Sequence, residues 1–446
     1  MRILIVTSFF PPQNSIASHR PYSWAKYWSR AGHQVTVVTT PKRHHDPLAM
    51  PMDSSEFTVV ELGYGNLFDK LVARYKRHQG QPQVASKPSS EKRPSIWRRL
   101  FNALDQYRSR RGFFDMRRFP DFSHFWADKA AEWASQNGKW DIVVSTYAPY
   151  TAHLAAYRIR KGRHADYWVA DYRDLWTDDH IFKGLPLVVW YERMLERQLI
   201  SKADLLTTVS APLCKKLQDR FGKTTLTIEN GYEPDDLVSL SQKSAFEGLP
   251  KKIRILYTGS IYKSTRDPSP LFEAIKRISI NVSESNLLEN LEVVFVGGNI
   301  ALLQEMIAEM GVERWVRLEG FVTRAQALTM QRDADVLLFL ESNVNGADGI
   351  LTGKIFEYLS SGTEVWAIGV TPDSTPGELI SNSGAGHVFG TDVDALESAL
   401  RVLLKNGPAP KRLVDSDVLK RYTREGLAMH MLQEVVAGKT QKKNGT

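Results

Sequence analysis

The residues best suited to chemistry lie in a short segment, residues 349–362, which reads GILTGKIFEYLSSG. It follows an apolar stretch, residues 336–340, that predicts a strand, and Gly362 is typical of a residue that ends a helix. The first turn of such a helix presents unpaired backbone N–H groups, to which Thr352 and Lys354 add a hydroxyl and a cation. The segment therefore predicts a phosphate site.

One turn further along this predicted helix lies Glu357. Its carboxylate is too far from the helix start to act as a cap, but it could accept hydrogen bonds from sugar hydroxyls of a ligand whose phosphates contact the first turn. Together these residues indicate a nucleotide-sugar site. The alternative is a solvent-exposed ion pair between Lys354 and Glu357, which would contribute only about 0.2–0.5 kcal/mol.

The pattern Gly-x-x-Thr-Gly-Lys-x-Phe-Glu-Tyr-Leu-x-Ser-Gly resembles the donor-site segment of retaining GT-B glycosyltransferases, the family 4-like group also called glycosyl transferases group 1. In that family two glutamates eight positions apart flank the donor. Glu357 matches the second, which in the family holds the ribose of the nucleotide. Gly349 stands where the first glutamate would be, so half of the motif is missing. The motif therefore does not indicate which residues bind the hydroxyls of the transferred sugar.

A second group of candidates follows the first predicted strand, residues 2–6, in a loop that leads into a helix and then a strand at residues 35–39. Ligands of parallel sheets bind at the carboxyl edge, where Ser15, His19 and Arg20 are expected. The loop has no Gly-x-Gly-x-x-Gly pattern, which argues against an NAD or FAD enzyme. Its Pro-Pro and the later Gly-His-x-Val-Thr-Val-Val-Thr resemble the acceptor-side loop of the same family. Arg20 could instead be an ordinary helix-start residue.

Two further motifs, Ser-x-Tyr-x-Pro around Tyr147 and Asp-x-Arg-Asp-x-Trp from Asp171, are similar to segments that line the cleft in one branch of the family. Charged residues just past a buried strand serve chemistry more often than packing. Asp171, Arg173 and Asp174 could equally form an internal ion-pair network that holds the loop.

The second half of the chain begins again with an apolar stretch ending in Gly259-Ser260. Glycine allows close approach of the backbone to a ligand, and Lys263 and Arg266 offer cations for a diphosphate. Family members carry a basic pair in this loop, often with Arg directly after the Gly, so Ser260 departs from the pattern. The loop containing Val322 corresponds to one that contacts the nucleobase in the family.

The resemblance implies a mechanism in which fixed cations stabilise the departing nucleoside diphosphate. Front-side attack with the departing phosphate as base would retain the anomeric configuration, and neither a cofactor nor a metal is required. The residues predicted to be catalytic are Asp171, Arg173, Arg266, Lys354 and Glu357. The residues predicted to bind the donor are Gly259, Ser260, Lys263, Arg266, Val322, Leu351, Thr352, Lys354 and Glu357. The acceptor-side residues are Ser15, His19, Arg20, Tyr147 and Asp174.

Composition limits the setting. With 446 residues, 42% of them apolar, the chain can form two cores. Cys214 is its one cysteine, which excludes an intramolecular disulfide and fits a reducing compartment. The chain starts with a strand pattern rather than a signal peptide and has no apolar run of about 18 residues. A cytoplasmic protein is predicted.

Acidic and histidine runs at residues 44–46 and 178–180 lack convergent partners, so no metal site is predicted.

Residues 64–119 form a basic segment with 14 Lys or Arg against four Asp or Glu, a local net charge of +10 compared with +8 for the whole chain. Apolar residues recur at helical spacing in residues 67–75 and 96–104. Basic amphipathic helices with Trp and Phe favour an anionic membrane surface, and a solvated face is the alternative. Nucleic-acid binding is disfavoured because no recognition motif accompanies the charge.

We therefore predict the α/β class and the GT-B architecture, with two Rossmann-like domains that face each other across a cleft. Residues 1–231 would form the acceptor-side domain with the basic insertion 64–119, and residues 232–412 the nucleotide-sugar domain. Residues 413–446 would form a helix that returns to the first domain, followed by a disordered tail.

The function predicted is a glycosyltransferase of the hexosyltransferase type. Its acceptor would be a polyprenyl-linked or other saccharide at the inner membrane face, in surface-polysaccharide biosynthesis. The alternatives are a non-catalytic sugar-nucleotide or membrane-binding protein, suggested by the missing glutamate, and a sugar-nucleotide epimerase on the same fold.

Overall fold

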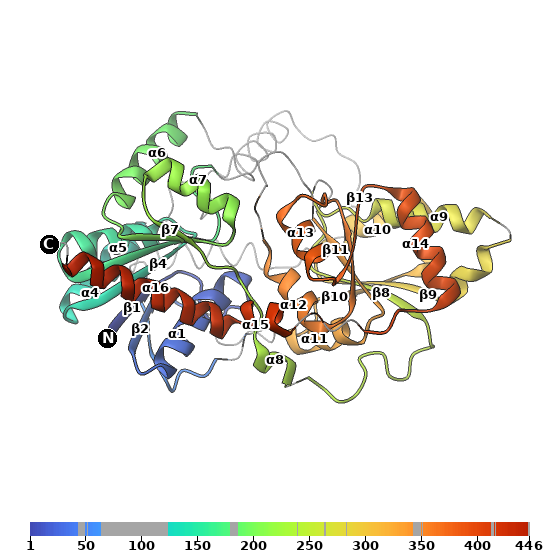
Figure 1. Ribbon diagram of the computed structural model, residues 1–446, viewed down its shortest axis with the longest axis horizontal. Helices are drawn as coiled ribbons and strands as arrows, with labels where there is room; N and C mark the ends of the chain where they lie inside the picture. Colours follow the sequence, from blue (N-terminus) through green and yellow to red (C-terminus); the bar gives the residue numbers. More distant parts are fainter. Residues whose placement is uncertain are drawn as a thin grey trace, which may run out of the picture. The chain divides into compact units, whose positions relative to one another are not determined.

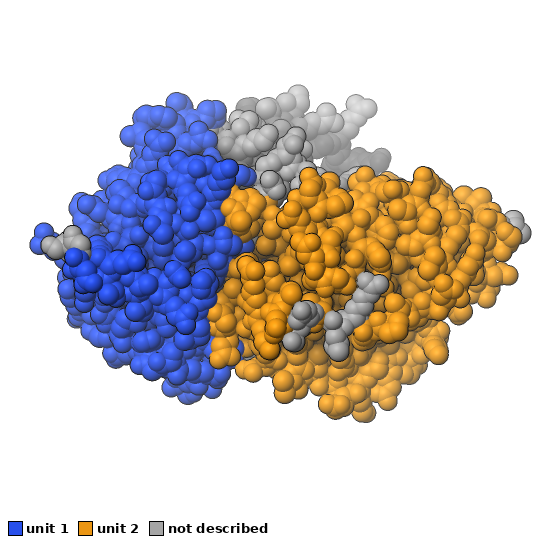
Figure 2. Space-filling view, viewed as in Figure 1, with its two compact units in different colours: residues 1–209, 213–228, 428–446 blue, residues 210–212, 229–427 orange. Residues whose placement is uncertain are grey.

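The chain forms two compact units in the computed structural model (Figures 1 and 2). Unit 1 comprises residues 1–209, 213–228 and 428–446, and unit 2 comprises residues 210–212 and 229–427. The structure describes residues 1–42, 50, 52–63, 124–178, 186–238, 240–262, 265–281, 283–341, 349, 351–411, 414 and 416–444. The basic segment 64–119 and Lys263 lie outside the described residues.

Unit 1 is built on a sheet of seven parallel strands in the order β3-β2-β1-β4-β5-β6-β7. The strands are β1 (Arg2–Val6), β2 (Gln34–Thr39), β3 (Thr58–Glu61), β4 (Trp140–Tyr147), β5 (Ala165–Tyr172), β6 (Leu205–Thr208) and β7 (Thr225–Thr227). Ile3, Leu4 and Ile5 are fully buried although successive side chains of a strand point to opposite faces. Both faces of the sheet are therefore covered, which explains why its strands read as apolar runs.

Helices alternate with these strands along the chain. They are α1 (Ile16–Arg30), α4 (His124–Gln136), α5 (Thr151–Lys161), α6 (Pro186–Ile200) and α7 (Ala211–Phe221). The core they enclose is rich in aromatic side chains, with Trp126, Trp168 and Trp176 fully buried. The order of the strands reverses between β1 and β4, which places a topological switch point between the carboxyl ends of these two strands.

Unit 2 repeats the design with six parallel strands in the order β10-β9-β8-β11-β12-β13. The strands are β8 (Ile253–Thr258), β9 (Leu291–Val296), β10 (Val316–Gly320), β11 (Val336–Leu340), β12 (Glu364–Ile368) and β13 (Gly386–Gly390). The helices are α8 (Pro234–Val238), α9 (Ser269–Ile280), α10 (Ile300–Met310), α11 (Arg324–Asp333), α12 (Gly353–Ser361), α13 (Thr375–Asn382), α14 (Val393–Asn406) and α15 (Ser416–Arg421). Here β8 and β11 flank the switch point. The two parallel sheets confirm the predicted α/β class.

Two glycines bring the ends of β8 and β9 into close approach. Gly259 and Gly297 have φ angles of 141° and 138°, and a Cβ at Gly297 would overlap the carbonyl oxygen of Gly259. The backbone N–H of Gly297 donates to the carbonyl of Gly320 at 2.7 Å, which fixes the turn. The sheet edge is thus closed by backbone contacts that no larger residue allows.

Gly297→Ala should therefore destabilise the protein more than a glycine replacement in open space. Gly311 is a matched control, because its φ is 69° but nothing lies within 4 Å of a Cβ there. We expect Gly311→Ala to cost about 1–2 kcal/mol of unfolding free energy from backbone strain. Gly297→Ala should cost about 1–3 kcal/mol beyond that from overlap. Urea denaturation of both variants measures the difference, and equal costs would contradict the close approach.

The C-terminal helix α16 (Arg424–Asn444) corrects the prediction of a disordered tail. Residues 428–446 belong to unit 1, where Trp28 Nε1 donates to the carbonyl of Ala428 at 2.8 Å. Lys439 Nζ donates to Asp141 Oδ1 at 2.5 Å, and Lys442 forms an ion pair with Asp204. Two lysines of the tail predicted to be disordered are thus bound to carboxylates of unit 1, and the helix continues through Asn444.

None of the helices within the described part of the chain is long and apolar enough to cross a membrane.

Candidate functional site

Helix α12 begins at the predicted phosphate site. Thr352 precedes it in extended conformation (φ −75°, ψ 148°), but its hydroxyl does not cap the helix. Thr352 Oγ1 is buried and has no hydrogen-bond partner among the described residues. Gly362 ends the helix with φ 70°, as the sequence predicts. The start of α12 therefore presents a hydroxyl that a ligand could satisfy.

Lys354 points from the first turn of α12 toward the end of β8. Its Nζ lies 4.2 Å from the centre of the Tyr257 ring and passes so close to Gly259 that any side chain at 259 would overlap it. Burial, together with the nearby guanidinium of Arg266, lowers the pKa of Lys354 to about 7. Among the described residues, Glu357 forms its ion pair with Arg324 and not with Lys354. The alternative of a solvated ion pair is therefore wrong.

Arg266 and Glu341 follow β8 and β11 and meet at the switch point. Arg266 Nη2 lies 3.6 Å from Glu341 Oε1, and its guanidinium lies 5.6 Å from the ring centre of Tyr262. Burial alone would lower the pKa of Arg266, but the carboxylate of Glu341 raises it above its ordinary value. Arg266 is thus a permanent cation at the same sheet edge as Lys354.

Glu357 is held by an arginine that the sequence did not point to. Arg324 Nη1 donates to Glu357 Oε1 at 2.7 Å, while its Nη2 donates to Asp236 Oδ2 at 2.8 Å. Burial would raise the pKa of Glu357, but Arg324 lowers it, so the carboxylate is ionised. Arg324 opens α11 directly after Thr323, whose side chain forms a capping box with Gln326. This Thr-x-x-Gln pattern was the available signal for a helix start at this point.

A second arginine, Arg424 at the start of α16, completes the ionic network. Its side chain is only 4% exposed. Burial and the neighbouring cation Arg324 lower the pKa of Arg424, and Glu357 acts in the opposite direction. Glu357 therefore interacts electrostatically with two arginines, both 33 or more residues away in the sequence.

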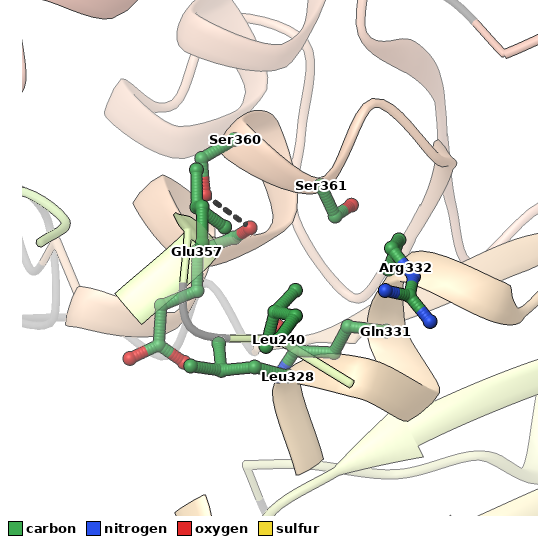
Figure 3. Close-up of a pocket in the computed structure, with 8 residues that line it drawn as sticks. Leu240, Leu328, Gln331, Arg332, Glu357, Ser360 and Ser361 are labelled. Atoms are coloured by element: carbon green, nitrogen blue, oxygen red, sulfur yellow. Dashed lines mark hydrogen bonds between the residues drawn. The ribbon is translucent and has the colours of Figure 1, made fainter. Parts of the chain in front are cut away.

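A cavity of about 190 Å³ lies beside Glu357 (Figure 3). Figure 3 shows Glu357 and Ser360 on α12 with Leu328 and Gln331 of α11 across from them. Gln331 Nε2 donates to Thr258 Oγ1 at 3.0 Å, whereas Oε1 of this buried amide has no partner among the described residues. Leucines and polar residues, among them Glu357 and Arg332, line the cavity together.

The other predicted donor residues take varied positions in unit 2. The carbonyl of Ser260 accepts a hydrogen bond from the Tyr257 hydroxyl at 3.1 Å, and that of Leu351 accepts one from Asn230 Nδ2 at 2.9 Å. Val322 is partly buried against the core. Of the predicted donor residues, Gly259 and Lys354 are in direct contact. Lys263 lies outside the described residues.

Gly349 shows why the first glutamate of the motif is missing. Its φ is 92°, and a Cβ there would lie 2.9 Å from Pro212 Cβ and from Ser210 Oγ. A glutamate at this position would be strained and would collide with both residues. The backbone conformation at position 349 and the contacts around it therefore favour glycine over the family's glutamate.

In unit 1, Asp171 at the end of β5 is fully buried and bound on both oxygens. Arg20 Nη2 donates to Asp171 Oδ1 at 2.7 Å, and Thr207 Oγ1 and Thr146 Oγ1 donate at 2.7 and 2.9 Å. Arg20, only 4% exposed, also donates to the carbonyl of Ile228 at 2.6 Å. This geometry favours the internal ion-pair network that was the alternative for Asp171, with Arg20 rather than Arg173 as its cation.

The remaining residues of the predicted acceptor side differ in accessibility. Arg173 pairs with Asp174 at 2.8 Å, and both are partly exposed. Ser15 Oγ lies 2.9 Å from Ser18 Oγ, whereas His19 is buried. The predicted residue Tyr147 is 1% exposed, with its ring stacked against aromatic neighbours. The accessible polar groups predicted here are thus Ser15 and the Arg173–Asp174 pair.

Residues 17–231 match the family model of the glycosyl transferase 4-like domain. Among solved structures, sucrose-phosphate synthase from Thermosynechococcus elongatus is similar with a TM-score of 0.59 at 14% identity, covering 100% of both chains. A trehalose-6-phosphate structure from E. coli bound with UDP-2-fluoro glucose gives a TM-score of 0.60 at 12% identity, covering 98% of this chain and 99% of the other. A putative UDP-N-acetylglucosamine 2-epimerase from Listeria monocytogenes gives 0.51 at 15% identity, covering 97% and 95%. No curated protein matches the chain in sequence.

These similarities, with the two parallel sheets, define a protein of the GT-B fold. Together with this fold, the match of residues 17–231 to the glycosyl transferase 4-like domain confirms the predicted enzyme class, a glycosyltransferase.

Proposed function

We propose that the protein transfers a sugar from a nucleotide-diphosphate sugar to a saccharide acceptor with retention of configuration. The proposal rests on the position of Lys354, which lies beside Gly259 at the start of α12. Next to it, the buried Thr352 hydroxyl has no hydrogen-bond partner among the described residues. A diphosphate at this point would receive the lysine cation, the hydroxyl and the backbone N–H groups of the first turn. Arg266 supplies a second positive charge at the same edge.

In the proposed reaction the bond between the anomeric carbon and the β-phosphate oxygen breaks while an acceptor oxygen bonds to the same carbon on the same face. The electron pair of the broken bond goes to the phosphate, whose new negative charge Lys354 and Arg266 stabilise. The departing phosphate accepts the proton of the attacking hydroxyl. No carboxylate is required as base, which suits the buried position of Asp171.

Glu357 is proposed to hold the ribose. Arg324 donates to Oε1 of Glu357. We expect the other carboxylate oxygen, Oε2, to accept hydrogen bonds from ribose hydroxyls. The adjacent cavity has room for part of the nucleoside. Val322, in the loop that precedes Arg324, stays a predicted nucleobase contact.

The proposed acceptor is a polyprenyl-linked saccharide at the inner face of the membrane, in surface-polysaccharide assembly. The support is the net charge of +10 in the basic segment 64–119, which is suited to anionic lipid. Neutralising Arg98, Arg99, Arg110 and Arg111 together should weaken flotation with anionic vesicles. Undiminished flotation would count against this part of the proposal.

The donor is tested by thermal denaturation of the purified protein with a panel of nucleotide sugars. At about 100 times the dissociation constant, a bound donor should add about 2.7 kcal/mol of stability. Lys354→Ala should abolish the shift. Lys411→Ala is a matched control, because burial also lowers the pKa of Lys411, whose Nζ contacts Thr363 Oγ1 away from α12's first turn.

The same preparation separates the alternatives. A transferase releases the nucleoside diphosphate only when an acceptor or water takes the sugar, whereas an epimerase converts the donor without any acceptor. The epimerase alternative is kept because of the similarity to the Listeria monocytogenes protein. Donor binding with neither turnover would favour a non-catalytic binding protein.

Affinity for a nucleoside diphosphate should fall as the pH rises above about 7. Lys354 is protonated below its pKa of about 7, and the diphosphate stabilises this protonated form. Above that pH, binding requires uptake of a proton, so affinity should drop roughly tenfold per pH unit until the pKa of the complex is reached. Titration calorimetry in two buffers of different ionisation enthalpy measures the proton uptake. Lys354→Met should remove the uptake, and an uptake that persists in this variant would exclude Lys354 as its source.

A further inference from the structure

Helix α6 of unit 1 buries both of its acidic side chains and exposes four large apolar ones, whereas Leu199 and Ile200 at its C-terminal end are buried in the core. Glu192 and Glu196 are 0% and 1% exposed. The large apolar residues that α6 exposes are Leu187, Trp190, Tyr191 and Met194, at 84%, 63%, 44% and 52%. From Leu187 to Glu196 this distribution is the reverse of that in an ordinary surface helix, whose apolar face is turned to the core.

The four exposed residues lie at positions i, i+3, i+4 and i+7, so they form one stripe along the helix, which we call the α6 stripe. In Figure 1, α6 lies at the upper edge of unit 1. Four exposed apolar side chains in one row form a contiguous patch, and such patches on proteins mark interaction surfaces.

Contacts on the inner face fix this orientation. Glu196 accepts hydrogen bonds from Tyr172 at 3.1 Å and from Thr177 at 2.7 Å, and it pairs with Arg220 at 2.7 Å. Rotating α6 to bury the stripe would remove these partners and leave a carboxylate without its cation. The stripe is therefore held outward by a buried polar network.

The charges that α6 exposes are all positive. Arg193 is 57% exposed and Arg197 is also exposed, whereas both glutamates of the helix face inward. Asp178, which lies 3.2 Å from Arg193, precedes the helix. The outer face of α6 thus combines apolar side chains with cations and offers no carboxylate of its own.

We infer that the α6 stripe lies against an anionic lipid surface. Trp and Tyr side chains favour the interface between headgroups and acyl chains, because each combines an apolar body with a polar tip. Leu187 and Met194 would enter the apolar layer, and Arg193 and Arg197 would contact lipid phosphates. A second copy of the chain fits less well, since two such faces would bring arginines together without acidic partners. The inference rests on the membrane-attachment part of the proposed function and gives it a defined surface.

The first test is flotation of the full-length protein with vesicles of phosphatidylcholine, alone or mixed in equal parts with phosphatidylglycerol. The variant Leu187→Ser/Trp190→Ser/Met194→Ser should lower the partition onto the mixed vesicles by roughly tenfold or more, because it removes the large apolar side chains that enter the bilayer. All three side chains are exposed, so the fold should be unaffected. The matched control replaces three residues of unit 2 that are 87%, 68% and 58% exposed, in the variant Val238→Ser/Ile280→Ser/Val402→Ser.

A second test places a label on the stripe itself. In a Cys214→Ser background, Met194→Cys carrying an environment-sensitive dye should shift to shorter wavelength when mixed vesicles are added. The same dye on Val402→Cys should not shift. This readout does not depend on donor binding or on glycosyl transfer.

The outcomes separate this inference from the proposed function. Loss of flotation in the stripe variant, with the control unchanged and the Met194 label shifted, supports the inference. Flotation that survives in the stripe variant but is lost when Arg98, Arg99, Arg110 and Arg111 are neutralised would overturn it and leave membrane attachment intact. Absence of binding by the wild type overturns both. A wild-type dimer that the stripe variant converts to monomer, without loss of vesicle binding, would assign the stripe to a second copy.

Discussion

Replacing Lys354 with methionine should lower the rate of sugar transfer at saturating donor by roughly a hundredfold to a thousandfold. The charge that develops on the departing diphosphate lies, in the proposed reaction, against this ammonium group, and removing one preorganised donor of this kind has an effect of that size. Methionine keeps an unbranched apolar chain in place of the lysine stem, although it removes the ammonium group that lies over the Tyr257 ring. The loss should appear in kcat as well as in kcat/KM, because the interaction strengthens as the bond breaks.

Lys411→Met controls for the general effect of removing a partly buried lysine from unit 2, and its rate should stay within about twofold of the wild type because no reacting group is assigned near it. Release of the nucleoside diphosphate, followed under single-turnover conditions, measures the chemical step apart from product release. If Lys354→Met raised KM and left kcat unchanged, the lysine would bind the donor without stabilising the transition state.

The core of the donor site could be predicted from sequence because it is local. Thr352, Lys354 and Glu357 lie within six residues, and the helix that spaces them is marked by the strand before it and by Gly362 after it. Lys354 reaches Gly259 because parallel strands β8 and β11 end at the same edge, a consequence of topology that the alternation of strands and helices already implies.

The partners of Glu357 could not be predicted in the same way. Arg324 lies 33 positions before Glu357 and 88 after Asp236, so nothing local distinguishes it from other arginines of the chain. Arg424 becomes part of the network only through the packing of the C-terminal segment. Which of several arginines reaches a given carboxylate is decided by tertiary structure.

The burial of individual charged side chains could not be predicted from the sequence either. Asp171 and Arg173 stand two positions apart after the same strand and look equally suited to chemistry. In the structure the first is fully buried within the end of β5, where Arg20 reaches it, whereas the second lies beyond the strand and is partly exposed. The C-terminal lysines show the same limit, since their partners Asp141 and Asp204 belong to distant strands and loops.

Replacing Arg20 with methionine should lower the free energy of unfolding by about 3–5 kcal/mol, the cost of leaving a buried carboxylate without its cation. Arg20 and Asp171 are 4% and 0% exposed, so solvent cannot substitute for the lost guanidinium. Arg30→Met is the matched control in the same helix, because Arg30 pairs with Glu56 at the surface, where the two side chains are 47% and 36% exposed. That pair should contribute no more than about 1 kcal/mol.

The double variant Arg20→Met/Asp171→Asn should recover much of this loss, since a neutral amide no longer needs a cation. Thr146 and Thr207 donate to different oxygens of Asp171, so the amide oxygen can accept from one hydroxyl, and the amide NH2 can donate to the other. Urea denaturation followed by tryptophan fluorescence measures all four proteins, and Trp24, which lies 5.1 Å from the Arg20 guanidinium, reports on the site. Activity of the folded double variant then decides the role of Asp171. Retained transfer would make the Arg20–Asp171 pair a structural element that holds β5 to α1, whereas a folded but inactive protein would return Asp171 to the reaction as a catalytic residue.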